Sequence, residues 1–355
     1  MKKQIHGGDI YTCRPKADFS ANINPLGVPD RVRQAVADCI GDLANYPDPA
    51  CRKLRRAVAE FEKVPGENLI FGNGAAELIF AAAFAKKPKQ ALLLAPGFAE
   101  YEQALEAAGC AVRFYDLREE AGFYPGEDYF DRITEDLDMA FLCSPNNPTG
   151  VCLRPEFLLR AAERCREKDV LLVLDECFNG FLDDPEACSM KRKLAAYPNL
   201  LILKAFTKLY AMPGLRLGYA MSADRELLGE MERMLQPWNV SLPAQEAGTA
   251  ALGEKAYVEE ARNLIKKERV YLTEGLGKLG FTVFEPSANF IFFKGPVGLA
   301  DFCKARGYLI RDCKNYRGLS EGYYRIAVRR HEENTALLDV MAEAAGRNSG
   351  VQERM

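Results

Sequence analysis

The chain has 355 residues, 48% of them hydrophobic, so it can bury a large core and is long enough for two domains. Its 47 basic and 50 acidic residues are interspersed and leave a net charge of -3, which excludes a basic face or tail for nucleic acid or anionic membranes. The first residues, MKKQIHGGDIYTC, lack a following apolar run, and no later stretch reaches about 18 uncharged apolar residues. We therefore expect neither secretion nor a membrane span, and small molecules as partners.

From about residue 67 to 222, short apolar runs alternate with segments of helical periodicity such as 154–169. The runs cover residues 91–96, 111–117, 139–145, 170–176, 200–206 and 216–222. This alternation predicts the α/β class, with a mostly parallel sheet flanked by helices on both faces. In open sheets of this kind, ligands bind beyond the carboxyl ends of the strands.

The pattern changes after Pro243 to a long helical region at 244–279. Strand-like segments follow at 281–294, 308–313 and 323–330, and then a last helix at 332–346. We interpret this as a smaller α+β domain to which the N-terminal residues return. The predicted division is a large domain at 45–242 and a small domain formed by 1–44 and 243–355.

The eleven cysteines are scattered, odd in number and without a CxxC pair, which is typical of reduced thiols in the cytoplasm. The only two histidines are His6 and His331, and they are not clustered with cysteines. A transition-metal site would have to be built from carboxylates, so we expect no metal.

Two loops at the expected ligand edge carry glycine, proline and asparagine. In GNGAAELI (72–79), small residues precede an apolar helix whose free N–H groups could hold a phosphate, although a plain strand-to-helix turn has the same composition. SPNNPTG (144–150) follows a buried strand, and turn chemistry explains most of it. Asn147 in this loop could still direct an amide into a site.

Charged residues end two other apolar runs. Asp175 closes VLLVLDECF (170–178), where a helix cap or salt bridge is as plausible as a site in which the carboxylate holds a nitrogen base protonated. Lys208 and Arg216 lie in KAFTKLYAMPGLRLGY (204–219), although the lysine stem could simply reach solvent. A buried lysine is costly unless it is paired, hydrogen-bonded or neutral. Together with the two loops, these residues favour one site at one sheet edge.

The order and spacing of these motifs resemble the fold type I pyridoxal-phosphate enzymes, in the branch that holds histidinol-phosphate aminotransferases and threonine-phosphate decarboxylases. The resemblance runs from GNGAAEL through SPNNPTG, DECF and TKLYAMPGLRLGY to YRIAVR. It implies the aspartate aminotransferase-like fold type I, with pyridoxal 5'-phosphate as cofactor.

The resemblance also implies roles for individual residues. Lys208 would form a Schiff base with the cofactor's aldehyde, so no lone ammonium charge would have to be buried. Asp175 would pair with the pyridinium nitrogen. The other cofactor contacts would be Gly74, Ala75, Thr207 and Arg216 on the phosphate, Phe98 on the ring face and Asn147 on the phenolic oxygen. Tyr46 would reach the cofactor phosphate of a neighbouring subunit, so a homodimer is expected. Two positions depart from the family pattern: Phe178 replaces a common tyrosine, and Ala205 a common hydroxyl residue.

Three further segments resemble the decarboxylases of this branch: HGGD (6–9), DFSANINPLG (18–27) and LIRDCKNYRGLSEGYYRIAVR (309–329). By that resemblance the substrate would be bound by His6, Gly7, Asn22, Asn147, Arg311 and Arg325. Arg325 would take the carboxylate. The alternatives are a surface position for His6, beside which Asp9 replaces the usual asparagine, and ordinary ion pairs for the two arginines.

The expected activity is the decarboxylation of O-phospho-L-threonine, or of O-phosphoserine, to the phosphorylated amino alcohol used in cobalamin biosynthesis. The alternative enzyme is a histidinol-phosphate aminotransferase or a related class I/II aminotransferase, because the shared motifs do not separate the two reactions. A cofactor-binding regulatory module is the alternative from another class, but the chain shows no basic patch to support it.

Overall fold

The computed structural model of the chain describes residues 6–352, with side chains up to residue 346. Its main feature is a seven-stranded sheet in the order β2-β8-β7-β6-β5-β3-β4. The strands are β2 (Leu69–Asn73), β3 (Gln90–Ala95), β4 (Ala111–Asp116), β5 (Met139–Cys143), β6 (Leu171–Asp175), β7 (Leu200–Ala205) and β8 (Leu217–Met221). Only β8 runs against its neighbours in this sheet, so the predicted mostly parallel α/β fold is confirmed.

Both faces of this sheet are covered, as the apolar composition of its strands requires. Alternate residues of β6 enter different cores: Leu172 and Leu174 pack on one side and Val173 on the other. The first core includes residues of α2 (Arg52–Glu62), α5 (Pro155–Glu167) and α8 (Leu242–Ala251). The second includes residues of α3 (Ala75–Lys86), α4 (Ala99–Ala107) and α7 (Arg225–Met234). Helix α1 (Asp30–Asp38) packs against α8.

A second sheet of four antiparallel strands has the order β12-β13-β10-β9. Its strands are β9 (Thr282–Val283), β10 (Phe290–Lys294), β12 (Arg311–Asp312) and β13 (Tyr323–Ala327). The helices beside it are α9 (Lys255–Lys278), α10 (Leu299–Ala305) and α11 (His331–Gln352). The predicted strand at 281–294 is therefore two antiparallel strands, β9 and β10, which residues 284–289 connect. The last helix continues past the predicted end at residue 346.

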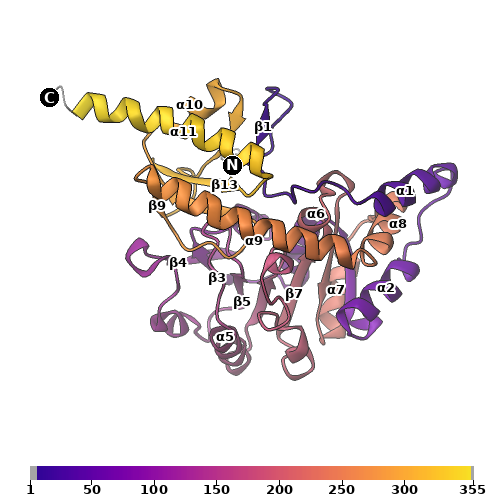
Figure 1. Cartoon of the computed structure of the whole chain (residues 1–355). Coiled ribbons are helices and arrows are strands. Elements are labelled where there is room, and N and C mark those ends of the chain that lie inside the picture. The colour runs from indigo at the N-terminus through magenta and orange to yellow at the C-terminus, as the bar shows by residue number, and fades with distance from the viewer. Residues whose placement is uncertain (1–5, 353–355) are drawn as a thin grey trace.

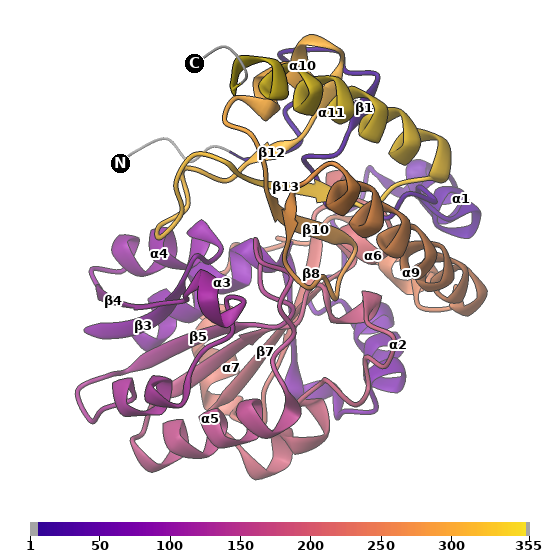
Figure 2. The same ribbon diagram turned by 60° about the vertical axis from the view of Figure 1, so that its left-hand side comes forward.

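The N-terminal residues return to this second sheet's region, where β1 (Ala17–Asp18) pairs in parallel with β11 (Tyr308–Leu309). Figure 2 shows the small sheet with α10 and α11 above one edge of the large sheet, while α9 runs beside both. The same arrangement is seen from another side in Figure 1. The boundaries at residues 45 and 242 stay a prediction.

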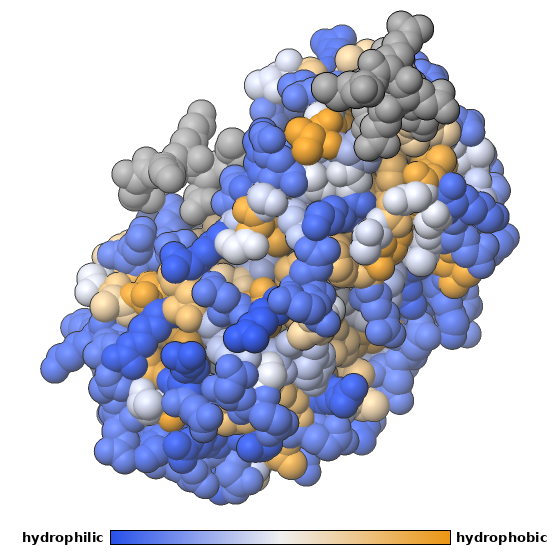
Figure 3. All heavy atoms as spheres, turned by 90° about the vertical axis from the view of Figure 1, so that its left-hand side faces the viewer, coloured by the Kyte–Doolittle hydropathy of each residue, from blue (hydrophilic) through white to orange (hydrophobic). Residues whose placement is uncertain are grey.

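The face shown in Figure 3 is mostly hydrophilic, with apolar residues in small groups. No helix in the described part of the chain is long and apolar enough to cross a membrane.

Candidate active site

A cavity of about 410 Å³ lies where the carboxyl ends of the large sheet's strands face the small sheet and the N-terminal segment. The predicted site residues that line it are His6, Gly7, Asn22, Ala75, Phe98, Asn147, Asp175, Thr207, Lys208, Arg216, Arg311 and Arg325. Gly74 and Tyr46 are the two predicted residues outside the lining. Segments separated by more than 300 residues in the sequence, such as those of His6 and Arg325, thus contribute to one cavity.

Two largely buried lysines four residues apart show how unusual Lys208 is. Lys204, on β7, has carboxylate partners in Glu176 at 3.2 Å and Glu62 at 3.6 Å, and these charges raise its pKa. Lys208 lies in the one-turn helix α6 (Phe206–Leu209) and has no ion pair within the described residues. Burial, together with the nearby charges of Arg325 and Arg216, lowers its pKa to about 8. Its amine is therefore more easily deprotonated than that of an ordinary lysine.

The turn that carries Lys208 is held by Asn24, which the sequence did not single out for any role. The Asn24 backbone N–H donates to the Lys208 carbonyl at 3.1 Å, and its side-chain amide donates to the Leu209 carbonyl at 2.7 Å. Asn24 is 2% exposed, so both bonds are shielded from water. The DFSANINPLG segment therefore fixes the lysine as well as contributing Asn22 to the cavity.

Asp175 ends β6 and is held from two sides. Its Oδ2 accepts a hydrogen bond from the Tyr101 hydroxyl at 2.6 Å, and its Oδ1 accepts one from the Cys177 backbone at 2.8 Å. Burial and the Asp175 charge raise the pKa of Tyr101 well above its usual value, so the phenol stays a donor. Tyr101 lies three residues after Phe98 in the segment PGFAEY (96–101), and sequence reasoning missed it. Only the fold shows that α4 lies beside the end of β6.

An anion cradle forms at the N-terminus of α3. Gly74 caps this helix with φ at +80°, and a Cβ there would collide with Nη2 of Arg216. The Arg216 guanidinium is also fixed by a hydrogen bond from Nη1 to the Pro213 carbonyl at 3.1 Å. Because the side chain of Thr207 and the first turn of α3 line the same part of the cavity, N–H, hydroxyl and guanidinium donors converge there.

Asn147 and Arg325 form a pair in the cavity wall. The Asn147 side-chain oxygen accepts a hydrogen bond from Arg325 Nη1, so its NH₂ group is the end left for a ligand. Arg325 Nη2 donates to the Ser20 carbonyl at 2.8 Å, while Nε is buried without a partner among the described residues. Arg325 is 6% exposed, and its contacts are to neutral groups. The alternative of an ordinary strand-edge ion pair does not apply to it.

Arg311 is also buried, at 7% exposed. Nη1 donates to the Asp312 carbonyl at 2.7 Å and Nη2 to the Asn315 side chain at 2.8 Å. The ring of Tyr316 lies 5.1 Å from its guanidinium carbon. Asn315 and Tyr316 also line the cavity, and sequence reasoning missed both because they lie in a hairpin connecting β12 and β13.

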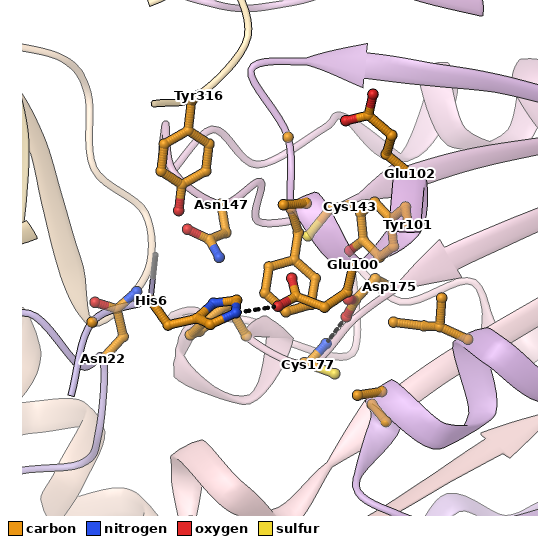
Figure 4. A pocket seen from close by; sticks show the side chains of 18 of the residues that line it. His6, Asn22, Glu100, Tyr101, Glu102, Cys143, Asn147, Asp175, Cys177 and Tyr316 are labelled. Carbon is orange, nitrogen blue, oxygen red and sulfur yellow. Dashed lines mark hydrogen bonds and ion pairs between the residues drawn. The ribbon is translucent and has the colours of Figure 1, made fainter. Parts of the chain in front are cut away.

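His6 enters the cavity from the N-terminal side and forms an ion pair with a residue that sequence reasoning also missed. Its Nε2 lies 3.2 Å from Glu100 Oε1, as Figure 4 shows. The second oxygen, Glu100 Oε2, is buried and has no partner in the described part of the chain, and the same holds for Asn22 Oδ1. Together with Arg325 Nε, these unpaired atoms indicate a cavity built for a polar ligand.

Of the other positions that the sequence singled out, Tyr46 lies outside the cavity, whereas Phe178 and Ala205 line it. Tyr46 is 78% exposed and stacks on Trp238 with ring centroids 4.4 Å apart, away from the cavity of its own chain. Phe178 lines the cavity and packs edge-on against Phe290 at 5.0 Å. Ala205 lines the cavity as well. The two departures from the family pattern therefore lie where a ligand would meet them. The other histidine of the chain, His331, lies outside the cavity and forms an ion pair with Glu268.

These residues fit an aromatic aldehyde that carries a phosphate and a ring nitrogen. Lys208 offers an easily deprotonated amine for the aldehyde, the α3 cradle offers anion donors, and Asp175 offers a carboxylate fixed for the ring nitrogen. Phe98 at the start of α4 offers an apolar face. The fold and this site define the class of pyridoxal-phosphate enzymes with the aspartate aminotransferase-like fold.

Comparison with known proteins defines the family. Residues 14–341 match the model of class I and II aminotransferases, so the chain belongs to that family, and its cofactor is pyridoxal phosphate. It is similar to a threonine-phosphate decarboxylase of Salmonella typhimurium, with 37% identity over 90% of this chain and 89% of the relative.

Two solved structures are also similar. A histidinol-phosphate aminotransferase from Clostridium acetobutylicum aligns with a TM-score of 0.87 and 31% identity over 93% of this chain and 99% of its own. An L-threonine-O-3-phosphate decarboxylase from Porphyromonas gingivalis aligns with a TM-score of 0.81 and 26% identity over 93% of this chain and 99% of its own.

Proposed function

We propose that this enzyme decarboxylates O-phospho-L-threonine, or the closely related O-phosphoserine, and releases carbon dioxide and the phosphorylated amino alcohol used in cobalamin assembly. The similarity to named threonine-phosphate decarboxylases supports this reaction. The single observation that carries the proposal is the joint presence of His6, Arg311 and Arg325 in one cavity with Lys208. Such a cavity has cations for two anionic groups of one amino acid, a carboxylate and a phosphate.

In this proposal Lys208 binds the cofactor's aldehyde covalently, and Asp175 keeps the ring nitrogen protonated. When bound, pyridoxal phosphate supplies an electron sink for the electron pair left by the broken bond. Arg216, Thr207, Gly74 and Ala75 would hold its phosphate. Phe98 would stack on the ring, and the NH₂ group of Asn147 would donate to the phenolic oxygen. The hydrogen bond from Tyr101 keeps the Asp175 carboxylate in place.

Arg325 selects the bond that breaks. A bond to the α-carbon is weakened when it stands perpendicular to the conjugated ring, so the residue that holds the carboxylate determines the reaction. The Arg325 guanidinium is fixed by Asn147 and by the Ser20 carbonyl, and its buried Nε still needs an acceptor. A carboxylate oxygen bound there would satisfy Nε. His6 and Arg311 then bind the substrate's phosphate, and Gly7 and Asn22 lie against the substrate.

The reaction ends with a proton transfer. The bond between the α-carbon and the carboxyl carbon breaks, carbon dioxide leaves, and the α-carbon takes up a proton. Lys208 is the proposed donor, because the pKa of its amine, lowered to about 8, lies close to neutral pH, where a general acid works best.

The second candidate is a histidinol-phosphate aminotransferase, which the similarity to the Clostridium acetobutylicum enzyme of that name favours. The test is to incubate the purified holoenzyme with O-phospho-L-threonine and follow carbon dioxide and amine release. Parallel samples receive glutamate and imidazole-acetol phosphate. Amino exchange in those samples without carbon dioxide release from O-phospho-L-threonine would establish the aminotransferase and contradict the decarboxylase.

We also propose a cytoplasmic homodimer in which Tyr46 contacts the cofactor phosphate of the partner subunit. Tyr46 and Trp238 form an exposed aromatic stack, and Ile40 and Leu43 nearby in the sequence are also exposed, at 60% and 55%. Clustered exposed apolar residues are typical of interaction surfaces. All eleven cysteines lie in the described part of the chain and are free, which supports a reducing compartment. Sedimentation analysis that shows a monomer at micromolar concentration would contradict the dimer.

A further inference from the structure

Glu100 lies in the active-site cavity without a role in the proposed reaction. It is the second residue of α4, and its neighbours are held on both sides: Phe98 precedes the helix and Tyr101 donates to Asp175. The Glu100 side chain is only 13% exposed and is directed toward His6 (Figure 4). Burial raises the pKa of its carboxyl group, and the charge of His6 opposes this rise. A partly exposed surface glutamate would not be fixed in this way.

His6 belongs to a segment that crosses the cavity and is anchored at Ser20. The Gly8 N–H donates to the Ser20 hydroxyl at 2.7 Å, and Gly7 lies so close to the Ser20 carbonyl that a Cβ would collide with it. The same carbonyl accepts the hydrogen bond from Arg325. The segment therefore starts at the carboxylate end of the cavity and reaches α4 through the contact between His6 and Glu100.

We propose that Glu100 is a positioning residue for the substrate's phosphate group, which acts by holding the His6 imidazole over the cavity. The inference rests on the proposed function and deepens it. His6 Nε2 lies 3.2 Å from Glu100 Oε1, so Nδ1 is the ring nitrogen that remains for a ligand. A phosphate oxygen on that side would place the imidazole ring between the Glu100 carboxylate and the phosphate. Arg311 supplies the second donor to the phosphate.

Glu100 and the substrate's phosphate are both negatively charged, so His6 is needed between them for the phosphate to bind. Glu100 Oε2 is buried without a hydrogen-bond partner in the described residues, and although Lys208 and Arg311 also attract the carboxylate, it would repel a phosphate dianion across the cavity. With His6 present, the ring lies between the two anions. Without His6, Glu100 becomes a purely repulsive group. A residue with a merely structural role would have no such dependence on its partner.

This dependence can be tested with a double variant, because Glu100→Ala should raise KM when His6 is present and lower KM when His6 is absent. In Glu100→Ala, KM for O-phospho-L-threonine should rise about tenfold, with kcat changed less than about threefold, because tenfold binding losses are typical of one charged contact, about 1.4 kcal/mol. His6→Ala should raise KM further. Adding Glu100→Ala to His6→Ala should then lower KM, since the repulsive carboxylate is removed.

The matched control is Glu102→Ala, because Glu102 lies on the same helical turn but points away from His6 (Figure 4). It should leave KM unchanged. Binding of L-threonine, which lacks the phosphate, should not respond to Glu100→Ala in holoenzyme followed by the cofactor's absorbance. Additive KM increases in the double variant, or a loss confined to kcat, would overturn the proposal.

A separate binding measurement distinguishes this proposal from the reaction itself. Calorimetric titration of each holoenzyme with inorganic phosphate reports the phosphate site without turnover. If the wild-type enzyme releases no carbon dioxide but phosphate affinity follows the predicted order, the decarboxylase reaction fails and the role of Glu100 stands. If carbon dioxide is released and phosphate affinity is the same in all variants, the role of Glu100 is contradicted.

Discussion

Lys204 and Lys208 provide the sharpest test of how the site is built, because two similar buried side chains should respond oppositely to the same substitution. In the folded apoprotein, burial lowers the pKa of Lys208 from 10.5 to about 8. A lowered pKa in a base means that the charged form is penalised on folding. The penalty is complete below about pH 8 and disappears as the pH rises toward the unfolded value of 10.5.

The magnitude follows from the size of that pKa difference. A pKa difference of about 2.5 corresponds to about 3 kcal/mol at neutral pH and to about 1 kcal/mol near pH 9.5, as upper bounds because Lys208 is not fully buried. Lys208→Met should therefore stabilise the apoprotein near pH 7, and the gain should shrink near pH 9.5. Lys204→Met should destabilise it by about 3 to 5 kcal/mol, since Glu62 and Glu176 lose a buried partner.

The assay is urea unfolding of the apoproteins at the two pH values, followed by the fluorescence of Trp238, the single tryptophan. The change in free energy of unfolding is compared with that of the unsubstituted apoprotein. A loss of stability in Lys208→Met near pH 7, or a gain that does not decrease at higher pH, would refute the idea that Lys208 is a desolvated amine without a charged partner.

The remaining predictions concern the cofactor. Lys208→Ala should abolish the absorbance band of the covalently bound cofactor and the activity, and persistence of both would contradict the assignment. Tyr101→Phe removes the 2.6 Å hydrogen bond to Asp175 and should lower kcat about tenfold with little change in KM, measured by steady-state kinetics. An unchanged kcat would show that the bond does not matter. Gly74→Ala places a Cβ against Arg216 and should weaken cofactor binding about tenfold or more in dialysis and reconstitution experiments. Equal affinity would show that Arg216 is not part of the cradle.

Most of the large sheet was predictable because inner strands such as β5 and β6 are fully buried and read as uninterrupted apolar runs, whereas the strand β2 at one edge was not among the predicted runs. The second sheet was less predictable from the sequence. The run at 281–294 mixes strand and turn residues, and the two-residue strands β11 and β12 join different sheets. Such short pairings depend on which segments meet in the fold, and local periodicity does not encode them.

The site likewise contains residues that could be predicted from the sequence and residues that could not. Lys208, Asp175 and Arg216 were identifiable because a charge at the end of an apolar run is unusual in itself. Tyr101 and Glu100 were not, since both occur in a helix whose spacing explains them equally well as ordinary core and surface residues. Their importance arises from contacts with Asp175 and His6, which are far away in the sequence.

The most direct test of the proposed activity is a single-turnover experiment with O-phospho-L-threonine labelled at its carboxyl carbon. A decarboxylase releases the label as carbon dioxide and regains the aldehyde form of the cofactor. An aminotransferase retains the carboxyl group in a keto acid and leaves the cofactor in its amine form. We predict one equivalent of labelled carbon dioxide per bound cofactor, with the original absorbance restored. Label retained in a keto acid, with the cofactor left in the amine form, would contradict the proposed function.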